Sequence, residues 1–486
     1  MSAQIETSAQ LLIDGEWRDG GGESIAVFNP ATGQQIGTVA AATAAEVDEA
    51  VAAAAAAFPA WSALSLQRRV QFLHRMRRNI EDHKEDLAHA ITLDQGKTLD
   101  EARGEVLRAT EFIETAIAAP MLYHSTAGNV SGSIDARHIR EPLGVCVAIT
   151  PFNFPVMNPS QFSAWALVTG NTLVLKGSEQ DPIATTSVIR LLQEAGLPAG
   201  VLNLVHGRAE VAQRLIDAPE VVAVSCITSS PVAKAIYQRA SQQGKRVQAN
   251  GGAKNPIVVA ADADLDQATE GIVSSAYGMA GQRCLAGTRI LVLAEVYDEL
   301  VEKVAQSVDK MVIGSGIDAG ISLGPVVSAA SKERLVTAIT QAVESGATPV
   351  RDGRTPQLQG ETGTAEGYFV GPTILTDLPL NHPVDAAETF GPVIVVHKVD
   401  SLDEAIAGAN ATEFGNAATI FTRSGTVARQ FEVGIRSGNV GVNTFPAPPA
   451  NFTMGGLGTS FYGDIHICGD APLRFYTEER LVVSRW

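Results

Sequence analysis

The chain is poor in cysteine, in long apolar segments and in excess basic charge. Its 486 residues include only four cysteines, which lie far apart and form no CxxC or Cys/His cluster. This spacing favours neither a disulfide framework nor a zinc site, so we expect no bound metal and a reducing, cytoplasmic location. The first ten residues lack the basic start and apolar core of a signal peptide. No apolar run is long enough to span a membrane, and we expect no membrane partner.

The charge balance is acidic. A formal net charge of -17 argues against nucleic acid or an anionic membrane as a partner, because both favour basic surfaces. With 45% hydrophobic and 18% charged residues, the composition is typical of a globular protein with extensive burial. A chain of 486 residues is too long for one ordinary core and predicts two domains or more.

The dinucleotide fingerprint G-x-G-x-x-G is also missing, so the common Rossmann argument for a nicotinamide cofactor does not apply. The chain shows instead an alternation of short apolar runs with helical patterns. We expect strands at 144–149, 172–175, 201–205 and 221–227, and helices at 43–58, 66–93, 160–168, 183–195, 211–216 and 232–243. Strands that alternate with helices predict βαβ units and a parallel sheet, hence an α/β protein.

Parallel sheets bind ligands at the carboxyl ends of their strands. Asn153 and Lys176 each fall just after an expected strand, where a ligand would lie. A second strand-helix series runs from about Pro256 to Asn443 and carries Cys284 and Glu388. We therefore expect two βαβ domains, with candidate site residues in both.

Cys284 is the candidate nucleophile. It lies in Gly281-Gln282-Arg283-Cys284-Leu285-Ala286, where small neighbours leave room for a substrate and the arginine supplies positive charge. Nearby positive charge lowers the thiol pKa and favours the reactive thiolate. On spacing alone, a small buried hydrophobic residue is the commoner role of a free cysteine. Both interpretations stay open at this point.

Four segments together resemble the aldehyde dehydrogenase superfamily. They are Thr150-Pro151-Phe152-Asn153-Phe154-Pro155, Leu175-Lys176-Gly177-Ser178-Glu179, Gly281-Gln282-Arg283-Cys284 and Glu388-Thr389-Phe390-Gly391-Pro392. Their order and separations fit that family, and the resemblance runs from Asp14-Gly15-Glu16-Trp17 to the end of the chain. It implies an aldehyde dehydrogenase-like α/β fold with two parallel-sheet βαβ domains and a small β oligomerisation element.

The resemblance also implies domain boundaries. The NAD-binding domain comprises residues 1–122 and 142–254, and the catalytic domain residues 255–458. The oligomerisation element comprises residues 123–141, which resemble a protruding hairpin, and residues 459–486. A homo-oligomer, dimer or tetramer, is therefore expected.

By the same resemblance, Cys284 attacks the aldehyde and Asn153 stabilises the oxyanion together with the Cys284 N–H. Lys176 and Glu179 bind the adenosine ribose, and a carboxylate at 179 favours NAD over NADP because it repels a 2'-phosphate. Glu388 holds the nicotinamide ribose. The implied cofactor-binding residues are in full Thr150, Phe152, Lys176, Glu179, Ser230, Glu388 and Phe390.

The pyrophosphate turn departs from the family pattern. Ser229 and Lys234 occupy its two glycine positions, whereas Ser230 is kept. Pro231 suits the first turn of a helix whose N-terminus could face a pyrophosphate. A side chain at 229 crowds the close backbone approach, so the resemblance leaves the pyrophosphate geometry open.

The most diagnostic departure is Asn250. Hydrolytic aldehyde dehydrogenases have a glutamate there to activate water, and Asn cannot accept that proton near neutral pH. A thiol needs less help, so we expect coenzyme A to take the acyl group as co-substrate. Gln248-Ala249-Asn250 and the tail residues Phe475-Tyr476-Thr477 resemble the CoA-acylating methylmalonate-semialdehyde branch of the family.

That branch oxidises methylmalonate or malonate semialdehyde to propionyl- or acetyl-CoA. Two of its arginines match Arg108 and Arg283, which could clamp the substrate carboxylate, or could be ordinary surface and loop residues. The segments Leu285-Ala286-Gly287-Thr288 and 446–456 differ from the branch, which leaves the aldehyde itself less certain than the reaction. Two alternatives stay open: a hydrolytic aldehyde dehydrogenase with another base, and a non-catalytic relative that keeps the fold for binding or structure.

Overall fold

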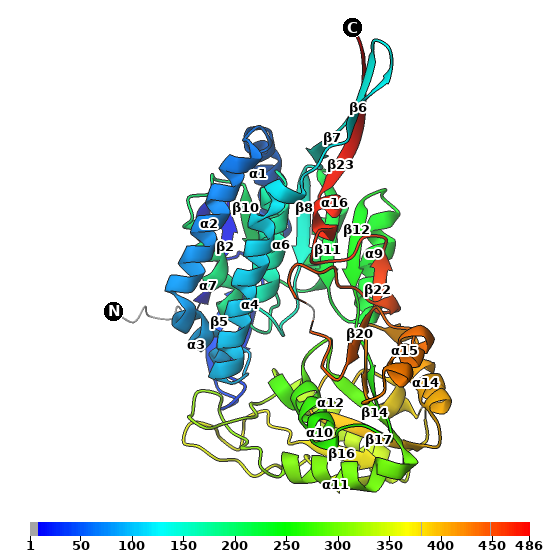
Figure 1. Cartoon of the computed structure of the whole chain (residues 1–486). Coiled ribbons are helices and arrows are strands. Elements are labelled where there is room, and N and C mark those ends of the chain that lie inside the picture. The colour runs from blue at the N-terminus through cyan, green and yellow to red at the C-terminus, as the bar shows by residue number, and fades with distance from the viewer. Residues whose placement is uncertain (1–7, 381, 448) are drawn as a thin grey trace.

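The computed structural model describes residues 8–380, 382–447 and 449–486. Two lobes and a narrow projecting arm make up the molecule (Figure 1). Residues 1–7, to which the signal-peptide expectation applies in part, and Pro448 of the departing segment 446–456 lie outside the described residues. In the described part of the chain, no helix is both long and apolar enough to cross a bilayer.

The first lobe is built on an eight-stranded sheet in the order β22-β12-β11-β8-β9-β10-β2-β3. Its five central strands are parallel, and β2, β3 and β22 are antiparallel additions. The strands are β2 (Leu11–Ile13), β3 (Glu16–Arg18), β8 (Val145–Ile149), β9 (Thr172–Lys176), β10 (Leu202–Val205), β11 (Val221–Ile227), β12 (Arg246–Asn250) and β22 (Phe461–Gly463). The strand β22 belongs to residues 459–486, yet it extends this sheet.

Helices cover both faces of that sheet. Alternate residues of β8 point to opposite faces, with Val145 and Val147 in one core and Cys146 and Ala148 in the other. One face packs against α1 (Ala44–Ser62), α8 (Ala209–Asp217) and α9 (Ser230–Ser241). The other packs against α2 (Leu66–Asp82), α3 (Lys84–Asp94), α4 (Leu99–Ile117), α6 (Met157–Val168), α7 (Pro182–Gln193) and α16 (Ala471–Phe475). The short α5 (Ala119–Leu122) follows α4.

The prediction of a single helix over residues 66–93 is wrong, because the structure has two helices there, α2 and α3. The chain leaves helical geometry at His83 (φ -115°, ψ 24°) and continues as α3. Buried apolar residues of both helices contribute to the same core, so the bend keeps each apolar face inward. Periodicity continues across such a bend and does not reveal it.

The second lobe holds a seven-stranded sheet in the order β15-β16-β17-β14-β13-β19-β20, parallel except for β15. Its strands are β13 (Asn255–Val259), β14 (Gly287–Leu293), β15 (Thr348–Arg351), β16 (Thr373–Thr376), β17 (Val393–Val399), β19 (Ala417–Phe421) and β20 (Asn439–Val442). Its helices are α10 (Leu265–Tyr277), α11 (Tyr297–Val308), α12 (Ala329–Glu344), α13 (Pro383–Ala386), α14 (Leu402–Asn410) and α15 (Gly425–Gly434), with short 3-10 turns η1 (Gly278–Gly281) and η2 (Ala294–Val296).

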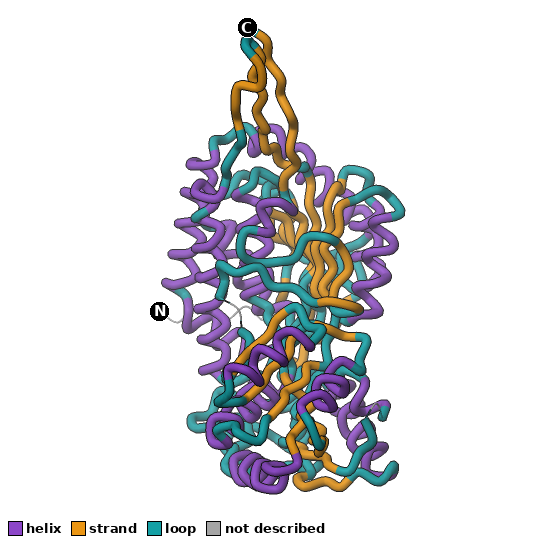
Figure 2. The backbone as a smooth tube through the Cα atoms, turned by 45° about the vertical axis from the view of Figure 1, so that its right-hand side comes forward, coloured by secondary structure: helices purple, strands orange, loops and turns teal. Residues whose placement is uncertain are grey.

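The arm is a three-stranded antiparallel sheet in the order β23-β7-β6 (Figures 1 and 2). Its strands are β6 (Ala127–Ser131), β7 (Ile134–Pro142) and β23 (Thr477–Arg485), which pairs with β7 along its whole length. Its apolar side chains Leu481 and Val483 are 57% and 60% exposed. The small strands β1 (Ser8–Ala9), β4 (Ser24–Phe28), β5 (Gln35–Ala40), β18 (Phe414–Gly415) and β21 (Leu457–Gly458) complete the fold.

Candidate active site

A cavity of about 560 Å³ brings together residues from distant segments of the chain, including all four predicted motif segments. It lies where β8, β9 and β11 end, and the loops around Cys284 and Glu388 of the second lobe form its other wall. The candidate site residues that line it are Thr150, Phe152, Asn153, Lys176, Glu179, Cys284, Glu388 and Phe390. This is the edge of the sheet at which parallel strands bind ligands.

The loop that carries Cys284 is held by its backbone. At Gly281 the φ angle is +69°, and a Cβ there would lie 2.2 Å from the Gly391 carbonyl oxygen, so only glycine fits. The Cys284 carbonyl oxygen accepts hydrogen bonds from the side-chain amides of Asn255 (3.0 Å) and Asn416 (2.8 Å). These bonds fix the direction of the peptide that carries the thiol.

The surroundings of Cys284 favour the neutral thiol. Burial raises its pKa to about 11, and the carboxylate of Glu388 acts in the same direction. The backbone N–H groups of Cys284 and Leu285 and the cation of Arg283 oppose this effect without overcoming it. Cys284 is half-buried, whereas the other three cysteines are buried and none of them lines the cavity. Cys284 is therefore the thiol that a ligand in this cavity can reach.

Asn153 lies beside the nucleophile loop. Its Nδ2 donates to the Gln282 carbonyl oxygen at 3.0 Å, and its own carbonyl oxygen accepts a hydrogen bond from Lys97 Nζ at 2.7 Å. A side-chain NH₂ group has two donors, of which this bond uses one. Asn153 and Cys284 thus line the same cavity, with the Asn153 amide bonded to the nucleophile loop.

The residues predicted to bind the two ribose groups come from different lobes. At the end of β9, Lys176 Nζ donates to Glu179 Oε2 at 2.7 Å. In the second lobe, Glu388 Oε1 accepts from the Ala253 N–H at 2.9 Å, and burial raises the pKa of its carboxyl group. A Cβ on Gly252 would lie 2.3 Å from Glu388 Oε2, so this glycine makes room for the carboxylate.

The predicted aromatic residues pack on each other. Phe390 and Phe152 meet edge to face with ring centroids 5.7 Å apart. Phe390 adopts a left-handed backbone with φ 47°. Both side chains line the cavity that also contains Cys284 and the ribose-binding candidates, where a flat ring could pack.

The pyrophosphate turn is arranged around Ser230. Its hydroxyl donates to the Thr459 carbonyl oxygen (2.7 Å) and accepts from the Gly252 N–H (2.9 Å), so it ties α9 to the neighbouring loops. The cavity is lined by Ser229 and Val232, whereas Lys234 is exposed on α9. Ser229 therefore borders the cavity just before the first turn of α9.

Asn250 lies at the end of β12 but does not line the cavity. Its Nδ2 donates to the Cys226 carbonyl oxygen on the neighbouring strand at 3.1 Å. The next two residues, Gly251 and Gly252, do line it. The Asn250 side chain therefore links the ends of the neighbouring strands β11 and β12.

The two arginines predicted to clamp a carboxylate lie outside this cavity. Arg108 on α4 donates to Glu111 (2.5 Å) and lies over the Phe112 ring, 5.1 Å from its centroid. Arg283 donates from Nη2 to the carbonyl oxygens of Ser274 and Ser275 and lies 5.2 Å from the centroid of the Phe445 ring. Burial lowers the pKa of Arg283.

Cys468 is a buried thiol that does not line the cavity. Burial raises the pKa of its thiol to about 12, with a smaller lowering by Arg108 and a smaller raising by Cys284. Its sulfur accepts a hydrogen bond from Gln161 Nε2 at 3.2 Å.

Several residues near the site were not predicted. Arg334 lines the cavity and donates to the Thr389 carbonyl oxygen at 2.5 Å. Lys254 is fully buried beside Glu388, and burial lowers its pKa to about 8. Lys97 contacts Asn153 from behind the loop. A lysine in a polar stretch of sequence is normally solvated, so burial of these side chains was not visible in the sequence.

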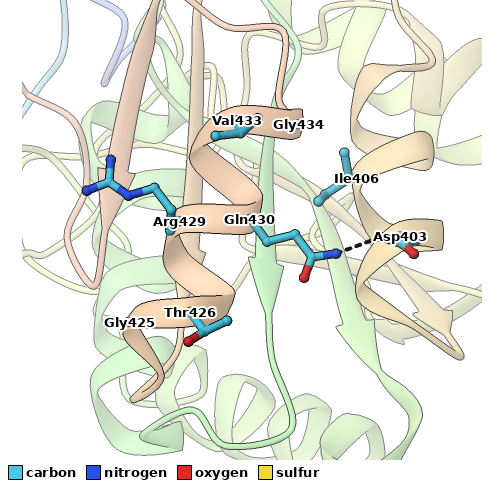
Figure 3. Close-up of a pocket in the computed structure, with 8 residues that line it drawn as sticks. All are labelled: Asp403, Ile406, Gly425, Thr426, Arg429, Gln430, Val433 and Gly434. Carbon is cyan, nitrogen blue, oxygen red and sulfur yellow. Dashed lines mark hydrogen bonds between the residues drawn. The ribbon is translucent and has the colours of Figure 1, made fainter.

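A second hollow, of about 710 Å³, lies between α14 and α15 (Figure 3). Gln430 Nε2 donates to Asp403 Oδ1 across it at 2.8 Å. The hollow is lined by Asp403, Ile406, Gly425, Thr426, Arg429, Gln430, Val433 and Gly434. None of these lining residues is a predicted site residue or a thiol nucleophile, so the chemistry belongs to the cavity at Cys284.

Comparisons with known proteins show the family to which the chain belongs. Residues 17–482 match the aldehyde dehydrogenase family. The chain is 42% identical over 489 aligned positions, all of both chains, to malonate-semialdehyde dehydrogenase 2 of Bacillus anthracis. Its structure superposes on methylmalonate-semialdehyde dehydrogenase from Oceanimonas doudoroffii with a TM-score of 0.96 and 38% identity over 99% of both chains.

A second solved structure has a bound cofactor. It is a Sinorhizobium meliloti 1021 protein, assigned as a methylmalonate-semialdehyde dehydrogenase and complexed with NAD. The TM-score is 0.96 and the identity 37%, over 99% of this chain and 98% of that one. These likenesses confirm the family resemblance and the α/β fold class that the four sequence segments indicated.

Proposed function

The chain belongs to the aldehyde dehydrogenase family, and on that basis we propose that it oxidises a carboxylated semialdehyde with NAD and passes the acyl group from Cys284 to CoA. The prediction of an aldehyde-oxidising enzyme is confirmed by the family match and by the full-length relatives. The alternative of a non-catalytic relative is disfavoured, because the nucleophile, the Asn153 amide and the ribose-binding carboxylates all line one cavity.

The residues of the cavity can divide the reaction among them. Cys284, once deprotonated, attacks the aldehyde carbon, and the negative charge on the oxygen is stabilised by Asn153 Nδ2 and the Cys284 N–H. NAD supplies the hydride acceptor, and Lys176, Glu179 and Glu388 are the residues that would hold its two ribose groups. Hydride loss leaves a thioester on Cys284. Two observations support binding of NAD in this cavity: the negative charge of Glu179, and the space that Gly252 leaves for the Glu388 carboxylate.

We propose CoA as the acyl acceptor because of how the carboxylates of the cavity and the Asn250 amide are bonded. Among the described residues that line the cavity, only Glu179 and Glu388 carry carboxylates. Glu179 is paired with Lys176, and Glu388 accepts the Ala253 N–H. The Asn250 amide is bonded to the Cys226 carbonyl oxygen. An amide at 250 cannot accept a proton from water near neutral pH, whereas a CoA thiol needs less activation.

The substrate is proposed to be malonate semialdehyde or its methyl derivative, since these are the aldehydes in the names of the relatives. Arg108 and Arg283 are the proposed carboxylate ligands. They are proposed because they match two arginines of the semialdehyde branch that the chain resembles. A guanidinium binds a carboxylate with two parallel hydrogen bonds, which would fix the orientation of the substrate.

The observation that carries the proposal is the meeting of Cys284, Asn153 and Glu388 in one cavity whose two lining carboxylates both have partners. The test is NADH formation from malonate semialdehyde with and without CoA. Without CoA we expect one burst of NADH followed by a slow steady rate, and with CoA a fast steady rate and an acyl-CoA product. Fast turnover to free acid without CoA would contradict CoA transfer and favour a hydrolytic enzyme.

The arm supports a homo-oligomer. Its β-sheet projects beyond both lobes and exposes Leu481, Val483 and Trp486, and apolar surface of this kind marks an interface. We propose a dimer or tetramer of identical chains. A cytoplasmic location is proposed as well, because all four cysteines are free thiols.

A further inference from the structure

The loop that carries Asn153 has no regular secondary structure, and a buried ion pair supports it from behind. Lys97 Nζ donates to Glu105 Oε2 at 2.6 Å and to the Asn153 carbonyl oxygen at 2.7 Å. The side chains of Lys97 and Glu105 have no exposed surface. The same ammonium group lies 4.7 Å from the centroid of the Phe154 ring. The pair thus contacts Asn153 and its neighbour directly.

The second oxygen of Glu105 binds the start of α6. Its Oε1 accepts hydrogen bonds from the N–H groups of Val156 (2.8 Å) and Met157 (3.1 Å). The first N–H groups of a helix have no partner within the helix, and a negative charge is favoured there. Glu105 therefore fixes the loop where it enters α6, three residues after Asn153.

The same segment also contacts the nucleophile loop. Glu101 Oε1 accepts the Met279 N–H at 2.5 Å, and its other oxygen closes a capping box with Thr98 at the start of α4. Asn153 Nδ2 is bonded to the Gln282 carbonyl oxygen. Residues 97–105 therefore contact both loops that supply the oxyanion donors.

We propose that Lys97 and Glu105 are positioning residues that hold the Asn153 amide where it donates to the oxyanion formed at Cys284. The inference rests on the proposed function, because it assigns a role in that reaction. Neither residue lines the cavity, so neither touches substrate. A buried ion pair adds little stability over apolar residues of the same size, but its directed bonds fix geometry. A displacement of about 1 Å at a reacting group costs on the order of 100-fold in rate.

The first test is Lys97→Met, measured by single-turnover NADH formation. We expect the burst rate constant to fall about 10- to 100-fold, because the Asn153 carbonyl oxygen loses its partner and the amide shifts. The Kd for NAD and the alkylation rate of Cys284 should change by less than about twofold. Lys97→Arg keeps the cation and should restore part of the rate. A burst rate constant that does not change in Lys97→Met would overturn the inference.

A double-mutant cycle tests whether Lys97 acts through Asn153. Asn153→Ala alone should lower the burst rate constant by about 100- to 1,000-fold, as loss of an oxyanion donor does. Lys97→Met combined with Asn153→Ala should be no slower than Asn153→Ala alone, because the positioned group is already gone. If Lys97→Met lowers the rate by the same factor in both backgrounds, Lys97 acts elsewhere and the inference fails.

Arg69 provides a matched control at the other end of α6. It is a buried cation whose Nε donates to the Val168 carbonyl oxygen at 2.8 Å. Arg69→Met should lower thermal stability and burst amplitude, which reports the folded fraction, while the rate constant stays within about twofold. A fall in the rate constant as large as that of Lys97→Met would make both residues merely structural.

The outcomes separate this inference from the proposed function. A wild-type protein that forms no NADH from semialdehydes refutes the function, whereas NADH formation with an unaffected Lys97→Met variant refutes only the positioning role. If Lys97→Met does not fold, Glu105→Gln takes its place. Its amide oxygen can still accept the α6 N–H groups, but it loses the charge that orients Lys97. The same fall in burst rate constant is expected, and its absence overturns the inference.

Discussion

Cys284 combines two properties at the scale of a single residue: it faces the cavity, and its surroundings favour the protonated form. Burial and Glu388 raise the thiol pKa to about 11 in the protein without cofactor. An ordinary thiol has a pKa of about 8.5. The nucleophile must therefore be activated by what binds beside it, and a positively charged nicotinamide ring would lower this pKa.

The first prediction follows from that pKa. Because only the thiolate is alkylated, the rate of Cys284 labelling by iodoacetamide should rise about tenfold per pH unit from pH 7 to beyond pH 9. Labelling is measured by mass spectrometry, with Cys284→Ser as the control for the three buried cysteines. Saturating NAD should shift the profile to lower pH. A plateau below pH 9 without NAD would contradict the raised pKa.

Cofactor preference gives a second prediction. Glu179→Ala removes the charge that disfavours a 2'-phosphate and leaves Lys176 free to bind it, so the preference for NAD over NADP should fall about 10- to 100-fold. The measurement is kcat/KM for both cofactors. Glu179→Gln is the matched variant, since it keeps an acceptor but removes the charge. Equal use of NADP by the wild type would rule out this role of Glu179.

A third prediction concerns the substrate carboxylate. Arg108→Leu should lower kcat/KM for malonate semialdehyde about 10- to 100-fold more than for propanal, because only the former loses a charge-assisted bond. Arg103→Leu is the control on the same helix, since Arg103 pairs with Glu85 on the surface. Equal losses on both aldehydes would show that Arg108 supports structure and not substrate binding.

At the scale of elements, the nucleophile loop depends on a backbone that few residues can adopt. Met279, Ala280 and Gly281 follow one another with φ angles of 55°, 51° and 69°. Two of the three are not glycine, so the turn is strained. The loop is held in this form by contacts with other segments, including the Glu101 carboxylate and the Asn255 and Asn416 amides.

The fourth prediction uses this turn. Gly281→Ala would place a Cβ 2.2 Å from the Gly391 carbonyl oxygen, so NADH formation should fall by at least about 100-fold. Gly104→Ala is the control, because a Cβ there meets nothing within 4 Å and α4 should gain about 0.5–1 kcal/mol. The measurements are burst rate and thermal unfolding. Full activity in Gly281→Ala would show that the loop can relax.

The sequence predicted elements better than their ends and their contacts. The strand-helix alternation from β8 to α9 was visible because each strand is a short apolar run that is buried on both faces. The bend at His83 was not visible in the sequence, because both helices keep the same apolar period. Among site residues, Cys284 and Asn153 were found through their motifs. Lys97 could not be predicted from the sequence. Its contact with Asn153 joins residues 56 positions apart and depends on the packing of α4 against α6.

At the scale of the whole molecule, the arm is built from two distant parts of the chain. The strand β23 pairs with β7 from Thr477 to Arg485, so the C-terminal segment and the hairpin at 127–142 form one unit. Leu481 and Val483 are two residues apart on β23 and therefore project to the same face. An exposed apolar face on a projecting sheet needs a partner to cover it.

The fifth prediction tests that partner. A variant with Leu481→Asp and Val483→Asp should sediment as a smaller species than the wild type, because burial of two charges in an interface is costly. Ile317→Asp is the control, since it changes an exposed apolar residue outside the arm. Sedimentation velocity measures the size. An unchanged size would place the interface elsewhere.

The pairing of β22 with β12 has a consequence for how the protein is made. The ribosome completes β12 long before it reaches Phe461, and until then this edge of the first lobe's sheet is open. An open strand edge can pair with other chains. The second lobe is synthesised entirely within that interval, so it emerges while the first is unfinished. A nascent chain halted between the two strands would carry most of the site residues and still be prone to aggregate.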